Sequence, residues 1–249
     1  MPGRNVANRP PPPAPADDWA LFLDVDGCLL DLAEQPDAVR VPSELRHALR
    51  SLADRLEGAL ALVSGRPLAG LDALFSPLQF AGAGLHGLER RNGEAGSPPP
   101  ARPEILDAVR EEATRLAARF PGALVEDKGV ALGLHWRGAP EAKDALRGFA
   151  DATLPRLPGY RLQHGNHVVE LRPEGGDKGN AIEALLAESP FRGRLPVFAG
   201  DDITDESGFA VVNARAGISV LVGDREPSAA HFALPGPGAV RRWLAEAVA

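Results

Sequence analysis

The chain has 249 residues, enough for one large domain or two small ones with a full core. Its net charge of −7 argues against a general nucleic-acid binder, and no apolar stretch reaches the ~20 residues that cross a bilayer. The single cysteine, Cys28, excludes an internal disulfide, and the first residues lack the apolar core of a secretory signal. These features predict a cytoplasmic protein.

Residues 1–16 are rich in proline and have almost nothing to bury, so we expect a disordered, solvated tail. The fold should begin with LFLDVDGCLL at 21–30, a buried strand that ends in two aspartates and a glycine. Because side chains alternate along a strand, Asp24 and Asp26 should emerge together where it stops, with Gly27 turning the backbone.

Two carboxylates about 4 Å apart repel by about 4 kcal/mol at an effective dielectric of ~20, so cations should lie near Asp24 and Asp26. Taken alone, the motif also fits an ordinary turn or a piece of a calcium-binding loop. A calcium loop needs further oxygen ligands, however, and leucines follow here instead.

The next segments predict a parallel sheet covered by helices. A helix is expected over 43–58, a buried strand over 59–66 and a third strand over 79–84. Strand, helix and strand in this order form a right-handed crossover, and uninterrupted apolar runs indicate strands covered on both faces. The same alternation returns later, with helices at 177–189 and 204–214 and strands at 195–201 and 218–223. This pattern predicts the α/β class, with a doubly wound, Rossmann-like parallel-sheet core.

Between the two halves the pattern changes, and SPPPARP at 97–103 and Gly175-Gly176 mark the change. The expected elements there are helices at 103–120, with Ile105 and Val109 inward, and 140–154, and strands at 130–136, 160–164 and 167–172. Two helices on a small sheet indicate an inserted α/β cap. We therefore divide the chain into a tail at 1–16, a core at 17–100 and 173–249, and a cap domain for substrate specificity at 101–172.

Polar motifs follow the predicted core strands in order. In a doubly wound sheet, ligands bind beyond the carboxyl ends of the strands, where the strand order reverses. The pair at 24 and 26, the triplet 64–66, Lys178 and the pair 201–202 should all lie there. A turn would explain the serine alone and a helix start the lysine alone, but their joint placement favours one site. Such a set resembles the four motifs of the haloacid dehalogenase-like phosphatase superfamily.

The resemblance assigns chemistry to these residues. Asp24 would be the nucleophile, since a carboxylate can attack a phosphomonoester whose charge is neutralised. Asp26 would protonate the leaving sugar oxygen and then activate water. Ser64 would donate to a phosphate oxygen, and Lys178 would hold nucleophile and phosphate in place. Cys28 stands where that superfamily usually has threonine, and we expect it to be buried and inert.

The same motifs predict a Mg²⁺ site, because carboxylates and a backbone carbonyl suit this ion better than zinc. Asp24, the backbone carbonyl of Asp26 and Asp201 would bind the metal. We place Asp202 with the metal ligands; it and Asp205 would act through water or by orienting the direct ligands.

The substrate prediction depends on a closer resemblance. AGLHGLERR at 83–91, VEDKGVALGLHWR at 125–137, VVELRP at 168–173 and GDDITDE at 200–206 are similar to trehalose-6-phosphate phosphatases. The resemblance implies that the sugar distal to the phosphate is bound by Glu126, Lys128 and Glu170, with His135 and Arg137 as weaker candidates. It further implies substrate contacts from Ser64, Gly65, Arg66 and His86, with Glu89 nearby.

The sequence therefore predicts a Mg²⁺-dependent enzyme of trehalose biosynthesis. It would hydrolyse trehalose 6-phosphate, a small-molecule substrate, to trehalose and phosphate through an aspartyl-phosphate, and a functional link to a trehalose-phosphate synthase is expected. Two alternatives stay open: a phosphatase of another sugar phosphate, such as sucrose phosphate or a glycosyl-phosphoglycerate, and a non-catalytic sensor or regulatory subunit. The presence of Asp24, Asp26, Lys178 and Asp201 argues against the non-catalytic alternative.

Overall fold

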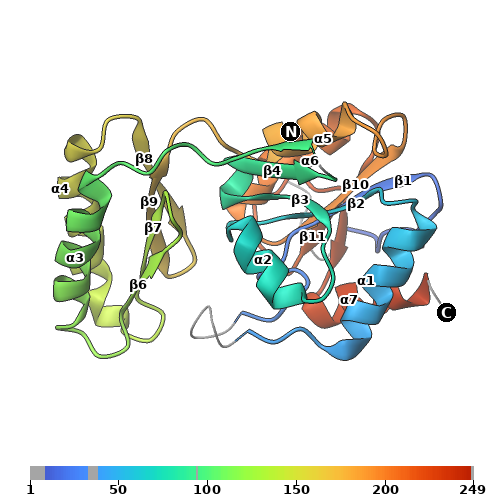
Figure 1. The fold of residues 1–249 in the computed structure, drawn as a ribbon. Helices are drawn as coiled ribbons and strands as arrows, with labels where there is room; N and C mark the ends of the chain where they lie inside the picture. The colour runs from blue at the N-terminus through green and yellow to red at the C-terminus, as the bar shows by residue number, and fades with distance from the viewer. Residues whose placement is uncertain (1–8, 33–38, 94, 248–249) are drawn as a thin grey trace. The chain divides into compact units, whose positions relative to one another are not determined.

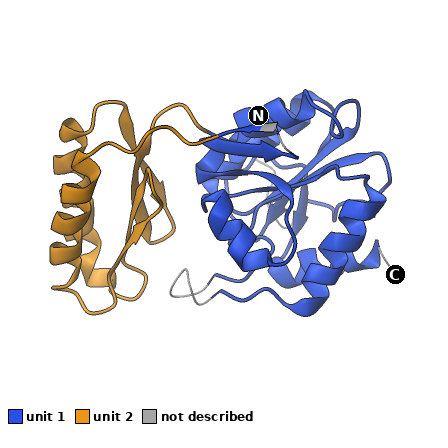
Figure 2. Ribbon diagram, in the orientation of Figure 1, with its two compact units in different colours: residues 1–97, 177–249 blue, residues 98–176 orange. Residues whose placement is uncertain are grey.

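A computed structural model describes residues 9–32, 39–93 and 95–247. The chain forms two compact units, one made of the residues up to 97 and from 177 onward, the other of residues 98–176 (Figure 2). The second unit is an insertion, because the chain leaves the first unit once and returns to it once. In the described residues, every helix is too short or insufficiently apolar to cross a membrane.

The first unit is built on an eight-stranded sheet in the order β12-β11-β10-β1-β2-β3-β4-β5. Its strands are β1 (Trp19–Leu23), β2 (Leu60–Val63), β3 (Ala81–Gly84), β4 (Glu89–Asn92), β5 (Ala95–Ser97), β10 (Leu195–Gly200), β11 (Ile218–Val222) and β12 (Phe232–Leu234). Its helices are α1 (Ser43–Arg55), α2 (Leu68–Phe75), α5 (Lys178–Leu186), α6 (Glu206–Ala214) and α7 (Pro237–Glu246). Helices α5 and α6 pack together on one face, and α1 and α7 on the other (Figure 1). From β12 to β3 the strands are parallel, which confirms the doubly wound α/β fold.

Strand β1 lies at the centre of this sheet, between β10 and β2. All five of its residues are buried, as expected for a parallel strand with helices on both faces. From β1 the chain runs outward to β2 and β3, and later to the other side through β10 and β11, so the strand order reverses between β1 and β10. Ligands bind at such a switch point, beyond the carboxyl ends of the strands.

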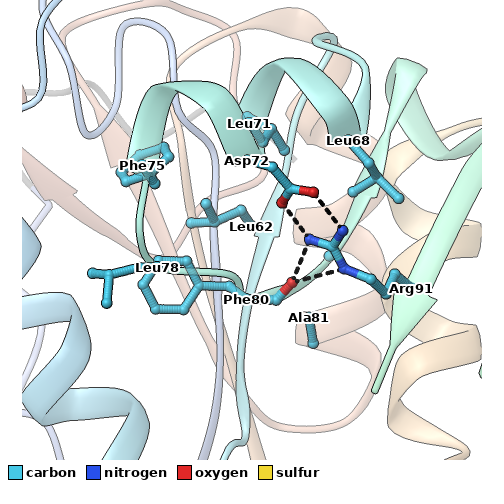
Figure 3. A pocket seen from close by; sticks show the side chains of 10 residues that line it. Leu62, Leu68, Leu71, Asp72, Phe75, Leu78, Phe80, Ala81 and Arg91 are labelled. Carbon is cyan, nitrogen blue, oxygen red and sulfur yellow. Dashed lines mark hydrogen bonds and ion pairs between the residues drawn. The ribbon is translucent and has the colours of Figure 1, made fainter. Parts of the chain in front are cut away.

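Strands β4 and β5 form an antiparallel extension that the sequence patterns do not predict. The segment of β4 has no apolar alternation, and its residues are half-buried. Arg91 of β4 donates to both carboxylate oxygens of Asp72 on α2, at 2.8 and 2.6 Å, and to the carbonyl of Phe80 (Figure 3). A small, largely apolar pocket lined by Leu62 and Phe75 adjoins this ion pair. The pair ties α2 to the edge of the sheet.

Residues 9–16 differ from the solvated tail that the sequence predicts, and residues 1–8 lie outside the described part of the chain. The side chain of Arg9 is 1% exposed, and its Nη1 lies 2.6 Å from Oε1 of Glu226. Its Nε donates to the carbonyl of Ala230 at 2.8 Å. Carbonyl oxygens of two prolines in the segment accept hydrogen bonds from β12 and α7. The segment therefore covers edge strand β12, which composition alone does not reveal.

The second unit places two helices, α3 (Ile105–Ala117) and α4 (Lys143–Thr153), on a four-stranded antiparallel sheet (Figure 1). Its strands, in the order β6-β7-β9-β8, are β6 (Leu124–Asp127), β7 (Leu132–His135), β9 (Val168–Pro173) and β8 (Tyr160–Gly165). Strand β6 is additional to the expected strands. Val109 is buried as expected, but the expected inward position of Ile105 is wrong, because α3 begins there and buries Leu106 instead.

The Arg9 contacts give a test of the N-terminal segment. Arg9→Ala should lower the free energy of unfolding by about 1.5 to 3 kcal/mol, because Glu226 and two carbonyls lose a charged donor. Urea denaturation would measure this, with Arg50→Ala as control, since Arg50 is exposed on α1. Equal stability of the two variants would contradict the packing of this segment.

Candidate active site

Four of the sequence-predicted residues meet at the switch point of the first unit. Asp24 directly follows β1, and its backbone N–H donates to the carbonyl of Ala199 on β10 at 2.9 Å. Asp201 directly follows β10, Ser64 follows β2, and Lys178 begins α5. The carboxyl ends of these strands thus bring together residues that are far apart in the sequence.

Lys178 is the centre of this group. Its Nζ lies 2.9 Å from Oδ1 of Asp24 and 2.7 Å from Oδ1 of Asp205. Oxygens of Asp24, Asp201 and Asp205 lie within 4.8 Å of one another. When all three are ionised, three negative charges face one ammonium, which leaves two negative charges uncompensated.

Burial and the neighbouring charges shift the pKa values of Asp24, Asp201 and Lys178. Burial raises the pKa of Asp24 well above its ordinary value of 3.8, and the carboxylates of Asp205 and Asp201 add to this, while Lys178 opposes it. Burial, and then the charge of Asp205, raise the pKa of Asp201 to about 7. Burial disfavours the charged form of Lys178, but Asp205 and Asp24 outweigh it and raise its pKa. The raised pKa keeps Lys178 charged, while the raised pKa values of Asp24 and Asp201 make these two carboxylates bind protons more readily than ordinary aspartates.

The group fits a divalent cation. Oδ1 of Asp201 is buried and has no hydrogen-bond partner among the described residues, so this residue of the cluster has an acceptor without a donor. Oxygen-only ligands of this kind suit a hard cation, and a double positive charge would balance the cluster. Gly27 makes room beside it: a Cβ there would meet Oδ2 of Asp201 at 2.2 Å, and its φ of +84° also favours glycine.

The structure puts Asp205 in place of Asp202 in this group. The side chain of Asp202 caps the short helix η6 (Ile203–Asp205), accepting from the N–H of Ile203 at 2.6 Å. Asp205 is fully buried and accepts from the N–H of Asp202 at 2.9 Å. The side chain of Asp202 forms the capping turn in this arrangement, and its place among the metal ligands stays a prediction from the sequence. Both aspartates belong to GDDITDE, and only the geometry of the capping turn decides which one faces inward.

Asp26 is paired with Arg66, a contact that the sequence patterns do not predict. Arg66 donates to both carboxylate oxygens of Asp26, at 2.7 and 2.8 Å. Its backbone N–H donates to Oγ of Ser64 at 3.2 Å, and the Ser64 side chain is buried. The arginine thus links the residues that follow β1 and β2.

His86 lies against the 64–66 loop, in the short helix η3 (Leu85–Gly87). Its backbone N–H donates to the carbonyl of Ser64 at 2.9 Å. Its imidazole lies against Gly65, where a Cβ would meet Nε2 at 2.6 Å. The φ values of Leu85 and His86 are +52° and +56°, which for residues other than glycine stores strain of about 1 to 3 kcal/mol each. This conformation holds the imidazole beside the loop.

Glu89 lies outside the cluster of Asp24, Asp201 and Asp205, and its carboxylate has a structural role. Its Oε1 accepts from the backbone N–H of Leu68 at 2.6 Å and so caps the start of α2. Cys28 is buried, and burial, followed by the charge of Asp24, raises the pKa of its thiol well above the usual value. The expectation of an inert thiol agrees with this environment.

The second unit gathers the predicted sugar-binding residues on its own sheet. Lys128 contacts the carboxylate of Glu170 on β9, and its Nζ lies 3.7 Å from Oε2 of Glu126 on β6. The same Glu126 oxygen lies 2.8 Å from Nε2 of His135 on β7. Burial opposes ionisation of Glu126, but the His135 hydrogen bond and the Lys128 charge outweigh it and lower its pKa. Arg137 donates to the carbonyl of Asn166 instead.

Comparisons with known proteins agree with these motifs. A family model described as trehalose-phosphatase matches residues 22–237. The chain is 44% identical over 231 residues to a probable trehalose-phosphate phosphatase of Sinorhizobium fredii, covering 92% of this chain and 87% of that protein. It is also 44% identical over 227 residues to a trehalose-6-phosphate phosphatase of Escherichia coli, covering 91% and 85%.

Solved structures show the same fold. The C-terminal domain of a Candida albicans trehalose-6-phosphate phosphatase superposes with a TM-score of 0.77 at 20% identity, over 92% of each chain. A trehalose-6-phosphate phosphatase related protein superposes with a TM-score of 0.74 at 24% identity, over 92% of this chain and 96% of that one. At these identities the likeness concerns the fold alone.

The raised pKa of Asp201 makes the stability of the metal-free protein depend on pH. Between its ordinary 3.8 and about 7 the folded protein holds more protons than the unfolded chain, so stability falls as pH rises. Asp201→Asn should therefore stabilise the EDTA-treated protein at pH 8 relative to wild type, and this advantage should shrink at pH 5. Thermal unfolding midpoints would show this, with the exposed Asp54→Asn as control. A variant that gains nothing at pH 8 would contradict the repulsion.

Proposed function

The chain belongs to the trehalose-phosphatase family of haloacid dehalogenase-like hydrolases, and we propose that it hydrolyses trehalose 6-phosphate to trehalose and phosphate. The observation that carries the proposal is the buried contact of Lys178 with Asp24 and Asp205 beside Asp201. A carboxylate held by an ammonium, next to an acidic group that could hold a divalent metal, suits phosphoryl transfer.

In the first step, an oxygen of Asp24 would attack the phosphorus. The phosphorus–sugar oxygen bond breaks, Asp26 gives its proton to that oxygen, and the phosphoryl group stays on Asp24. In the second step, water gives a proton to Asp26 and attacks the phosphorus, so that phosphate leaves and Asp24 is restored. Lys178, 2.9 Å from Asp24, orients the nucleophile throughout and offsets negative charge on the phosphate.

The ion pair between Arg66 and Asp26 must open during this reaction, because Asp26 has to reach the leaving oxygen. Both oxygens of Asp26 accept hydrogen bonds from Arg66, and these bonds hold the carboxyl group toward the arginine. An arriving phosphate offers the guanidinium a competing anion. We propose that Arg66 turns from Asp26 toward the phosphate, joining Ser64, and so frees the acid to act.

We propose that the metal is Mg²⁺, held by Asp24, Asp201 and Asp205 with the backbone carbonyl of Asp26. When bound, it would supply positive charge that neutralises the phosphate oxygens. Asp205 also keeps Lys178 in place from the other side, and Asp202 shapes the turn that aims Asp205 inward. Magnesium prefers oxygen ligands, and each of these residues offers one.

Sugar recognition is proposed for Glu126, Lys128 and Glu170 in the second unit. Their side chains form a connected cluster of two carboxylates and an ammonium, with His135 holding Glu126. Charged groups of this kind hold sugar hydroxyls by hydrogen bonds of about 1.5 to 3 kcal/mol each. The cytoplasmic location and the link to a trehalose-phosphate synthase stay predictions from the sequence.

Replacing the nucleophile tests the reaction. Asp24→Asn should abolish phosphate release from trehalose 6-phosphate, because an amide cannot form the covalent intermediate, while circular dichroism stays unchanged. Release should also require Mg²⁺ and stop with EDTA. Asp54→Asn, an exposed change on α1, should keep full activity. Undiminished activity of Asp24→Asn would exclude the proposed nucleophile, and faster hydrolysis of another sugar phosphate would refute the substrate.

Removing one sugar-binding charge tests specificity. Glu126→Gln should raise KM for trehalose 6-phosphate about 10-fold or more, since a charged hydrogen bond of about 1.5 kcal/mol or more is lost. Hydrolysis of p-nitrophenyl phosphate, which has no sugar, should not change. Glu112→Gln is the matched control, because Glu112 forms a surface pair with Arg156 on the same unit. Equal effects on both substrates would contradict a role in sugar recognition.

A further inference from the structure

Arg225 makes an unusual set of contacts with the loop that follows β10. It lies just after β11, and its Nε donates to the carbonyl of Asp201 at 3.2 Å while its Nη2 donates to that of Asp202 at 3.3 Å. The same Nη2 contacts the carboxylate of Glu206, the first residue of α6. One guanidinium therefore binds the carbonyl oxygens of two successive peptide groups.

This loop needs such a support. An oxygen of the Asp201 carboxylate lies within 4.8 Å of oxygens of Asp24 and Asp205, and repulsion between like charges favours moving it away. The capping turn of Asp202 and Asp205 fixes the part of the loop that follows Asp201. The backbone of Gly27 lies close to the Asp201 carboxylate and restricts its movement in that direction. The contacts of Arg225 act on the backbone of Asp201 itself and leave its carboxylate available.

The segment that carries Arg225 is itself anchored. Oε2 of Glu206 accepts from the N–H of Ala229 at 2.8 Å, so the glutamate bridges the arginine and the far end of the same segment. From the other side, buried Arg9 binds Glu226 and the carbonyl of Ala230. The segment of Arg225 is therefore fixed at several points while Arg225 contacts Asp201. Both residues also line one pocket next to Gly27.

We propose that Arg225 is a positioning residue of the metal site: it holds the loop of Asp201 so that this carboxylate faces Asp24. The inference rests on the proposed function for the identity of the metal and deepens it with a residue outside the motifs that the sequence analysis identifies. Arg225 would act through its contacts with the backbone of Asp201 and Asp202 and with Glu206. Its loss should therefore weaken Mg²⁺ binding more than it weakens substrate binding.

The test is Arg225→Met, with Arg91→Met as the matched control. Arg91 also joins a carboxylate, Asp72, and a backbone carbonyl in the same unit, but it lies on β4 and holds α2 (Figure 3). Both variants should lower the unfolding midpoint of the metal-free protein. Calorimetric titration with Mg²⁺ should show a Kd raised about 10- to 100-fold for Arg225→Met alone, as for partners that orient metal ligands. KM for trehalose 6-phosphate at saturating Mg²⁺ should change little.

Two milder variants keep the test decisive if Arg225→Met does not fold. Arg225→Lys keeps the charge but cannot span both carbonyls and Glu206, so its Kd for Mg²⁺ should lie between wild type and the methionine variant. Glu206→Gln keeps the acceptor and should weaken Mg²⁺ binding less. An unchanged Kd in Arg225→Met, or in Arg225→Lys where the former is unfolded, would overturn the inference. Wild-type protein that binds no Mg²⁺ would contradict the proposed function itself, and the inference with it.

Discussion

The site depends on one buried ammonium that faces more negative charge than it can balance. Lys178 is 3% exposed and contacts Asp24 and Asp205, while Asp201 adds a third carboxylate. Buried charges cost several kcal/mol each unless they are paired, so this arrangement is unfavourable in the free protein. Such local instability is typical of active sites, and the rest of the fold must supply the free energy that offsets it. The central, fully buried strand β1 gives that support.

Different cationic side chains pair with the different carboxylates of this region. Arg66 pairs with Asp26, and Arg225 pairs with Glu206. Lys178 pairs with both Asp24 and Asp205. Among the described residues of this group, Asp201 has no salt bridge of its own, and its buried Oδ1 is without a hydrogen bond. The protein thus fixes the outer acids with its own side chains and leaves the inner face for an added cation. The same principle, a cation between two acids, recurs in the cluster of the second unit.

The sequence predicted the elements that bury apolar runs and the residues that follow them. Asp24, Ser64 and Asp201 could be predicted because strand ends converge in a parallel sheet. Lys178 could be predicted because it lies at the start of a helix that the sequence also predicts. Asp205 could not be separated from Asp202, since a capping turn of three residues decides which carboxylate faces inward. The β4 and β5 hairpin, and the packing of residues 9–16, depend on arginine contacts across more than ten residues, which periodicity does not record. The pair of Arg66 and Asp26 was missed for the same reason.

The central claim is that the phosphoryl group passes through Asp24. Borohydride reduces an aspartyl-phosphate to homoserine, so a turnover mixture of the protein, Mg²⁺ and trehalose 6-phosphate can be quenched with it and mapped by peptide mass spectrometry. The expected result is homoserine at position 24, dependent on substrate and absent from Asp24→Asn. Steady hydrolysis without reduction of any aspartate, or with the reduced residue at another position, would contradict the account.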